Sequence, residues 1–208
     1  MVAGWHAHTH ARGRRIRGAY WPHLTTLCLA ANIEKRVYVL VEGRKGMEVN
    51  QPRAVHVAEG EGKMLWVADE LMTFKATAED TGGAYSLTDS MVPPGGGPPP
   101  HIHHREDEAF WVLEGELEVM VGETTFKAGV GSFVHLPKDI PHAYENVSTG
   151  PARFLTLMVP GGVEKFFEEV GKPGSDVSSP PPFEEEDIEK FLAIAPKYGA
   201  EILPPPEQ

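Results

Sequence analysis

The sequence predicts an all-β fold, a barrel or sandwich of short strands, followed by helices. Between residues 55 and 159, apolar and polar residues alternate with the period of two that is typical of half-buried strands. Gly, Pro and Asp interrupt this alternation at short, regular spacing. After Gly161-Gly162 the strand period gives way to a helical one. With 208 residues, 41% of them hydrophobic, the chain is long enough for one domain with a full core.

Ten strands are expected in the alternating region, and the segment 116–121 shows the pattern most clearly. Leu117, Val119 and Val121 share one face, while Glu116 and Glu118 share the other. One face of the sheet therefore belongs to the core and the other to solvent. The expected strands are 64–68, 71–78, 84–92, 99–104, 108–113, 116–121, 124–127, 132–136, 142–147 and 152–159.

Two helices are expected after the strands. The first spans residues 163–170, and the second begins at the acidic run 184–187, since carboxylates in a first turn complement the positive end of the helix dipole. An apolar stripe on the second helix consists of Ile188, Phe191, Leu192 and Ala195. We expect residues 47–160 to form the β domain and residues 161–208 to form a helical extension that covers an open edge or mouth of it.

Residues 1–46 differ in character from the rest of the chain. They carry eight Lys and Arg against two Asp and Glu, whereas the whole chain has a net charge of −11. Three interpretations are open. The segment is a targeting sequence built on Arg14-Arg15, or a metal-binding tract of His6, His8 and His10, or a poorly ordered arm that precedes a true start at Met47. We favour the third.

Composition excludes several classes of protein. No run of 18 apolar residues occurs, so no membrane-spanning helix is expected, and the acidic charge argues against a nucleic-acid partner. Cys28 is the only cysteine, which rules out an intramolecular disulfide. The expected location is the cytoplasm.

A set of histidines and one glutamate has the spacing of a metal site. His101 and His103 are two residues apart, so in a strand they leave the same face, with Cα atoms roughly 6.6 Å apart. Glu108 has an odd offset from them, and it reaches the same ion only if the chain bends within residues 104–107. His142 would come from a later strand. Imidazoles with one carboxylate and no thiolate suit Fe, Mn, Ni, Co, Cu or Zn.

Two motifs resemble those of the cupin superfamily. The segment Gly95-x5-His101-x-His103-x4-Glu108-x6-Gly115 fits the first motif at every defined position. The second motif is Gly131-x5-Pro137-x-Asp139-x2-His142-x3-Asn146, in which Asp139 stands where the family has Gly. We expect the turn to survive, because Asp tolerates left-handed geometry. The resemblance implies a jelly-roll-like β-barrel that holds one divalent transition metal per chain through His101, His103, Glu108 and His142.

A narrower resemblance lies in residues 74–83 and 98–110, which look like bacterial single-domain cupins of the quercetin 2,3-dioxygenase-like group. It implies a metal-dependent dioxygenase that uses O2 on a flavonol-like or other enolisable aromatic molecule. In such enzymes the residue that matches Glu108 takes the 3-hydroxyl proton, and carbon monoxide is released. The alternatives are a cupin decarboxylase or isomerase of a small carboxylate or sugar, and a non-enzymatic cupin that binds a metal or small molecule. An apolar, aromatic pocket favours the first, and Lys or Arg beside the metal favours a carboxylate substrate.

Several neighbours of the ligands have expected roles. Phe110 and Tyr144 share faces with ligands, so each lines the pocket or belongs to the core. Trp111, on the opposite face, is expected in sheet packing or a subunit contact, and His104 is expected to face away from the ion. Asn146 is expected to be structural. A homodimer is expected from the edge strands and from the resemblance.

Overall fold

A computed structural model describes residues 37–39, 47–49, 51–178, 180–182 and 184–204. The chain divides into two compact units between Glu48 and Val49. In the described part of the N-terminal region, β1 (Val37–Val39) and β2 (Met47–Val49) form a two-stranded sheet. The three interpretations of residues 1–46 rest mainly on Arg14-Arg15 and on the early histidines, which lie outside the described residues.

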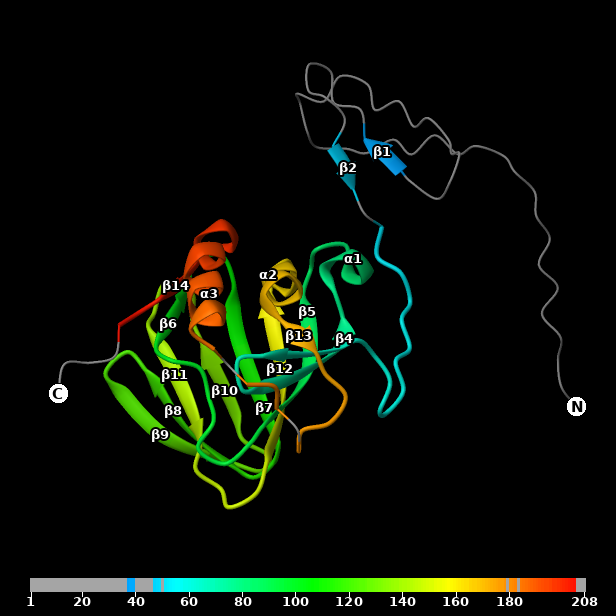
Figure 1. The fold of residues 1–208 in the computed structure, drawn as a ribbon. Coiled ribbons are helices and arrows are strands. Elements are labelled where there is room, and N and C mark those ends of the chain that lie inside the picture. Colours follow the sequence, from blue (N-terminus) through cyan, green and yellow to red (C-terminus); the bar gives the residue numbers. More distant parts are fainter. Residues whose placement is uncertain (1–36, 40–46, 50, 179, 183, 205–208) are drawn as a thin grey trace, which may run out of the picture. The chain divides into compact units, whose positions relative to one another are not determined.

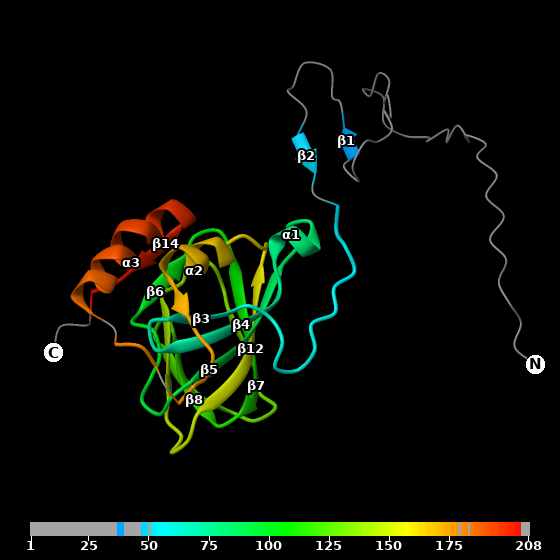
Figure 2. The same cartoon turned by 45° about the vertical axis from the view of Figure 1, so that its right-hand side comes forward.

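The second unit is built from two antiparallel sheets that face each other, as Figures 1 and 2 show. The larger sheet has the strand order β10-β7-β12-β5-β4-β3-β13, and the smaller has the order β14-β6-β11-β8-β9. The all-β prediction is confirmed, with the strands in two sheets rather than one closed hydrogen-bonded barrel in the described part of the chain. All ten expected strands are present: β3 (Met64–Val67), β4 (Glu70–Ala76), β5 (Ser86–Val92), β6 (His101–His103), β7 (Asp107–Glu114), β8 (Glu116–Val121), β9 (Thr124–Gly129), β10 (Phe133–Leu136), β11 (His142–Asn146) and β12 (Ala152–Val159).

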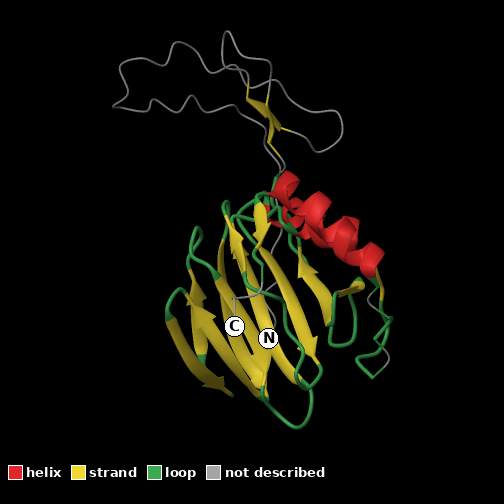
Figure 3. Ribbon diagram, turned by 60° about the vertical axis from the view of Figure 1, so that its left-hand side comes forward, coloured by secondary structure: helices red, strands yellow, loops and turns green. Residues whose placement is uncertain are grey.

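The helices lie at one end of the two sheets (Figure 3). They are α1 (Ala78–Thr81), α2 (Glu164–Val170) and α3 (Glu185–Tyr198). Helix α3 begins with a capping box between Glu184 and Asp187, and it ends at Gly199, which takes the left-handed φ of 79°. None of the helices in the described residues is long and apolar enough to cross a membrane.

Two short strands after residue 161 were not predicted. β13 (Lys172–Pro173) pairs with β3 at the edge of the larger sheet, and β14 (Ala200–Ile202) pairs with β6 at the edge of the smaller sheet. Segments of two and three residues are too short to show a period of two, so sequence alone gave no signal. The C-terminal region therefore contributes strands to both sheets in addition to its helices.

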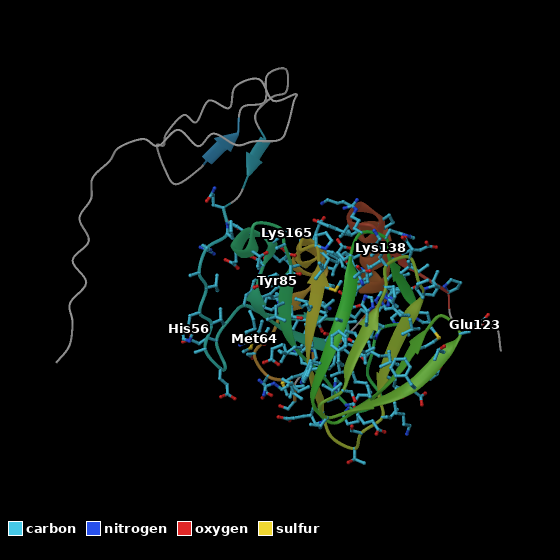
Figure 4. All side chains as sticks on the ribbon, turned by 180° about the vertical axis from the view of Figure 1, so that it is seen from behind. His56, Met64, Tyr85, Glu123, Lys138 and Lys165 are labelled. Carbon is cyan, nitrogen blue, oxygen red and sulfur yellow. The ribbon has the colours of Figure 1, made fainter. Side chains whose placement is uncertain are left out.

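Buried side chains form two apolar clusters. One cluster lies between the sheets, where inward residues such as Phe110, Leu117 and Phe154 alternate with outward ones. The other joins β3 and β4 to the C-terminal helices through residues such as Phe74, Phe166 and Ala195. Figure 4 shows side chains filling the interior between the sheets. Burial of these apolar surfaces supplies the main stabilisation of the unit.

Candidate metal centre

The four candidate ligands converge from both sheets. His101 and His103 leave the same face of β6, and both are buried. His142 on β11 is paired directly with His101 in the antiparallel ladder, which explains how a residue 41 positions later reaches the same place. Glu108 is on β7, in the opposite sheet. The bend that the sequence required within residues 104–107 is the crossing of the chain from the smaller sheet to the larger one.

Their side chains are close enough to share one ion. One ligand atom from each of the four lies within 4.8 Å of those of the other three. Oε2 of Glu108 is 3.2 Å from Nε2 of His142 and 3.9 Å from Nε2 of His103. The ring centroids of His101 and His142 are 4.4 Å apart. This arrangement can hold a metal.

Backbone carbonyls orient two of the imidazoles. Nδ1 of His101 donates to the carbonyl oxygen of Pro99, and Nδ1 of His142 donates to that of Ile140, each at 2.9 Å. Because a carbonyl oxygen only accepts, Nδ1 carries the proton in both rings and Nε2 is left as the bare nitrogen of the neutral form. Nε2 is therefore the atom each ring offers to a cation.

The third imidazole faces a carboxyl group instead. Nδ1 of His103 is 4.0 Å from Oε2 of Glu106, and neither atom has a hydrogen bond within the described residues. Glu106 lies in the crossing between β6 and β7, and burial raises its pKa to about 7. It was not singled out from the sequence, because a glutamate in a polar stretch beside two motif histidines gives no separate signal.

Electrostatics keep the histidines available as ligands. Burial lowers the pKa of His101 to about 3 and also lowers the pKa of His103, so both rings are neutral near pH 7. Burial alone would lower the pKa of His142 and raise that of Glu108. The close approach of the carboxylate to the imidazole, at 3.2 Å, outweighs burial, so the pKa of His142 is raised and that of Glu108 is lowered. Glu108 is therefore an anion among imidazoles.

The donor set fits a divalent transition metal. Oε2 of Glu108 and Nε2 of His142 are buried and have no hydrogen bond within the described residues. Unpaired buried polar atoms are costly, and a cation between them would satisfy both. Three imidazoles with one carboxylate are ligands for such metals, and the set does not discriminate among Fe, Mn, Ni, Co, Cu and Zn.

Asp139 takes the left-handed conformation that the second motif requires. Its φ is 64°, as expected when Asp replaces the usual Gly, and its N–H donates to the carbonyl oxygen of His103 at 2.8 Å. Its Oδ1 accepts from Nδ1 of His104 at 2.8 Å, and Nε2 of His104 lies 3.3 Å from Oε2 of Glu201. His104 thus lies outside the ligand set, as predicted, and links the motif turn to β14.

A cavity of about 260 Å³ opens beside the ligands. Its polar lining consists of three acidic residues, two of the histidines and Tyr144, and no Lys or Arg is among the described residues that line it. Ile188 and Leu192, which the sequence placed on the apolar stripe of α3, line this cavity and are 47% and 51% exposed. The apolar lining includes Val67, Met72, Pro98, Pro99, Phe166, Phe167, Phe191 and Ile202.

The two pocket candidates have different positions. Tyr144 lines the cavity, whereas Phe110 is buried in the cluster between the sheets and is absent from the cavity lining. The ring centroids of the two side chains are 5.1 Å apart, so Phe110 supports Tyr144 from behind. Both residues share a face with ligands, and the sequence could not show which one reaches the open space.

Residues 89–159 match the family model described as a cupin domain, a range that includes both motifs. The chain therefore contains a cupin domain. Its cupin region is 29% identical over 114 residues to the quercetin 2,3-dioxygenase of Bacillus subtilis, a match covering 55% of this chain and 34% of that enzyme. It is also 29% identical over 115 residues to the polyketide synthase CurC of Streptomyces cyaneus, covering 55% of this chain and 73% of the relative. The cupin thus spans about a third of the length of the Bacillus relative.

Two solved structures resemble part of the chain at low sequence identity. KdgF from Halomonas sp. is 14% identical with a TM-score of 0.48, and the alignment covers 54% of this cupin and 99% of that chain. A predicted oxalate decarboxylase from Thermotoga maritima is 18% identical with a TM-score of 0.48, over 50% of this cupin and 98% of that chain.

Glu70 is a residue of the cavity that sequence reasoning missed. It begins β4, it is buried, and it lines the cavity together with Asp69. The only signal was its place in the alternation, since Glu70 shares a face with Met72 and Phe74 of the core. An acidic residue after Asp69 at a strand start looks instead like part of a turn.

Two further expectations concern Asn146 and Trp111. Asn146 is buried, and its side-chain amide donates to the carbonyl oxygens of Val92 and Gly150 at 2.9 Å, which confirms its structural role. Trp111 lies on the outer face of β7 and is 50% exposed, beside the exposed ring of Phe133. The expected homodimer stays a prediction.

Proposed function

We propose that this cupin is a metal-dependent dioxygenase that acts on a flavonol-like or other enolisable aromatic molecule. The observation that carries the proposal is the cavity itself: His101, His103 and Glu108 line one space with apolar side chains from both sheets and from α2 and α3. Apolar walls with a few convergent polar groups suit a small aromatic ligand. The volume of about 260 Å³ lies just below the usual range for drug-sized ligands, which favours a compact, planar molecule.

Glu108 is proposed as both a ligand and a proton acceptor. Its Oε2 is placed between Nε2 of His142 and Nε2 of His103, and its pKa is held low by these neighbours. An ionised carboxylate beside the metal position can take the proton of a substrate hydroxyl as the enolate forms. When bound, a divalent metal would supply Lewis-acid stabilisation of that enolate oxygen. The neutral imidazoles of His101 and His103 would orient the site without taking the proton.

The charge of the lining supports an uncharged substrate over a carboxylate. Asp69, Glu70 and Glu108 all line the cavity, and no lysine or arginine of the described residues compensates them there. A small carboxylate would meet like charges in a buried site, which is unfavourable. This observation weighs against a decarboxylase or isomerase of a small carboxylate. The name of the Bacillus relative agrees with an oxygenase, although the match covers only 34% of that enzyme.

The test is turnover of quercetin by protein loaded separately with Fe, Mn, Co, Ni, Cu and Zn. We expect at least one metal to support consumption of quercetin in air, with release of carbon monoxide, and none to support it without oxygen. His142→Ala should abolish turnover, and Glu118→Gln, which removes an exposed carboxylate on β8, should not change it. Metal-loaded protein that turns over neither quercetin nor simpler flavonols would contradict the proposal.

A further inference from the structure

A second pair of polar side chains meets in the cavity away from the metal position. Glu70 comes from β4 in the larger sheet, and Tyr144 comes from β11 in the smaller sheet. The Tyr144 hydroxyl donates a short hydrogen bond to Oε2 of Glu70. Both residues line the same cavity as His101, His103 and Glu108. The pair therefore bridges the two sheets at the wall of the cavity.

Glu70 has hydrogen-bonding capacity that the described residues do not use. Five buried side-chain atoms of the described residues have no hydrogen bond, and four of them belong to the candidate ligands or to Glu106 beside them. The fifth is Oε1 of Glu70. The other acidic residue at this wall is engaged, because Oδ2 of Asp69 accepts from the N–H of Gly97 at 3.1 Å.

A purely structural role explains Glu70 poorly. Burial raises the pKa of Glu70 to about 7; the nearby hydroxyl groups of Ser90 and Tyr144 partly counter this, and the charges of Glu108 and Asp69 add to it. A glutamine would fill the same volume and still accept from Tyr144 without the cost of a buried acid. A buried ionisable group with a perturbed pKa on a cavity wall is a candidate functional group.

We propose that the Glu70–Tyr144 pair determines substrate specificity by binding a ring hydroxyl group other than the one that meets the metal site. Glu70 accepts the hydrogen bond from that hydroxyl, and Tyr144 holds the carboxyl group in position. The substrate class is then a polyhydroxylated, uncharged aromatic molecule rather than any enolisable one. The inference rests on the proposed function in one respect: it takes from it that an aromatic molecule enters the cavity.

The experiment compares two ligands that differ in the second hydroxyl. Quercetin and 3-hydroxyflavone both carry the 3-hydroxyl group, but only quercetin carries hydroxyls on the outer rings. Their dissociation constants are measured by calorimetry on zinc-loaded protein without oxygen, so that binding is independent of turnover. At pH 8, where Glu70 is mainly ionised, a hydrogen bond to this charged group corresponds to a preference of about tenfold or more for quercetin in the wild-type protein.

Glu70→Gln should reduce this preference at least about fivefold, and Tyr144→Phe should also reduce it, while zinc content stays at one per chain. Glu118→Gln is the matched control, and it should keep the wild-type preference. If Glu70→Gln fails to fold, Tyr144→Phe alone carries the test. An unchanged preference in the folded variants overturns the inference. It is also overturned if the wild-type protein binds neither flavonol, or binds both with equal affinity.

The outcomes separate the two proposals. If the preference for quercetin depends on Glu70 but the protein turns over no flavonol, the dioxygenase proposal is refuted and the role of the Glu70–Tyr144 pair stands. If the protein turns over flavonols but the preference for quercetin does not depend on Glu70, the dioxygenase proposal stands and the role of the pair is refuted.

Discussion

Nε2 of His142 lies 3.2 Å from Oε2 of Glu108, although the two residues belong to different sheets. The contact ties the first motif to the second motif across the interior. It also places a carboxylate against an imidazole whose Nδ1 is already committed to a backbone carbonyl. The two atoms most suited to share a cation are thus held together by strands of the two sheets rather than by a loop.

His101→Ala and His142→Ala should each abolish metal retention and leave the sheets folded, because both rings direct Nε2 to the site. Elemental analysis after dialysis measures the metal, and circular dichroism measures the fold. His104→Ala is the matched control: it removes an adjacent histidine that is exposed and bound to Asp139 instead. Full metal content in the double variant would refute the site.

Metal affinity should fall as pH is lowered. The pKa of His142 is raised by Glu108, so protons compete for its Nε2 at mildly acidic pH. Raising the pH removes that proton and strengthens binding. Competition with a chelator at pH 5.5 and pH 8 measures the change, and equal affinity at both values would contradict a site that contains His142.

Glu106→Gln should weaken metal binding by about tenfold. The carboxyl of Glu106 faces Nδ1 of His103 at 4.0 Å, and a small movement would let it accept from this N–H and orient the ring. The readout is the dissociation constant for zinc, with the exposed Glu114→Gln as control. Unchanged affinity in Glu106→Gln would mean that His103 is oriented by its strand alone.

Glu70→Gln should stabilise the metal-free protein by about 3 kcal/mol at pH 8. The pKa of Glu70 is raised from 4.5 to about 7 on folding, so the wild-type protein loses stability as pH rises through this window. Glutamine does not titrate, and the difference should vanish below pH 4.5. Urea unfolding across this range measures it. Asp69, Glu108 and Tyr144 are the titratable groups that face Glu70, and all remain in the variant.

Asp139→Val should destabilise the protein by about 1–2 kcal/mol, while Asp139→Gly should preserve the turn. The φ of 64° at this residue disfavours a β-branched side chain and suits glycine. Thermal unfolding of the two variants gives the comparison. Equal stability of Asp139→Val and wild type would show that the turn relaxes without strain.

The site was predictable from sequence to different extents at different residues. His101 and His103 follow from the period of a strand. Glu108 required a bend, and only the structure shows that this bend is a change of sheet. Glu70 and Glu106 were missed, because an acidic side chain next to a turn looks solvent-exposed until the opposite sheet is in place. Phe110 and Tyr144 could not be distinguished, since sharing a face with a ligand does not show whether a side chain reaches the cavity or stays in the core.

Residues 200–202, near the end of the chain, support the strand that carries two of the candidate ligands. Ala200 pairs with His103 and Ile202 pairs with His101, so the strand that carries both histidines lies between β11 and β14. A chain trimmed before Gly199 would expose one edge of β6 to solvent. Open strand edges recruit other chains, so shortened versions should aggregate and lose metal together. Affinity tags and fusion partners are therefore better placed at the other terminus.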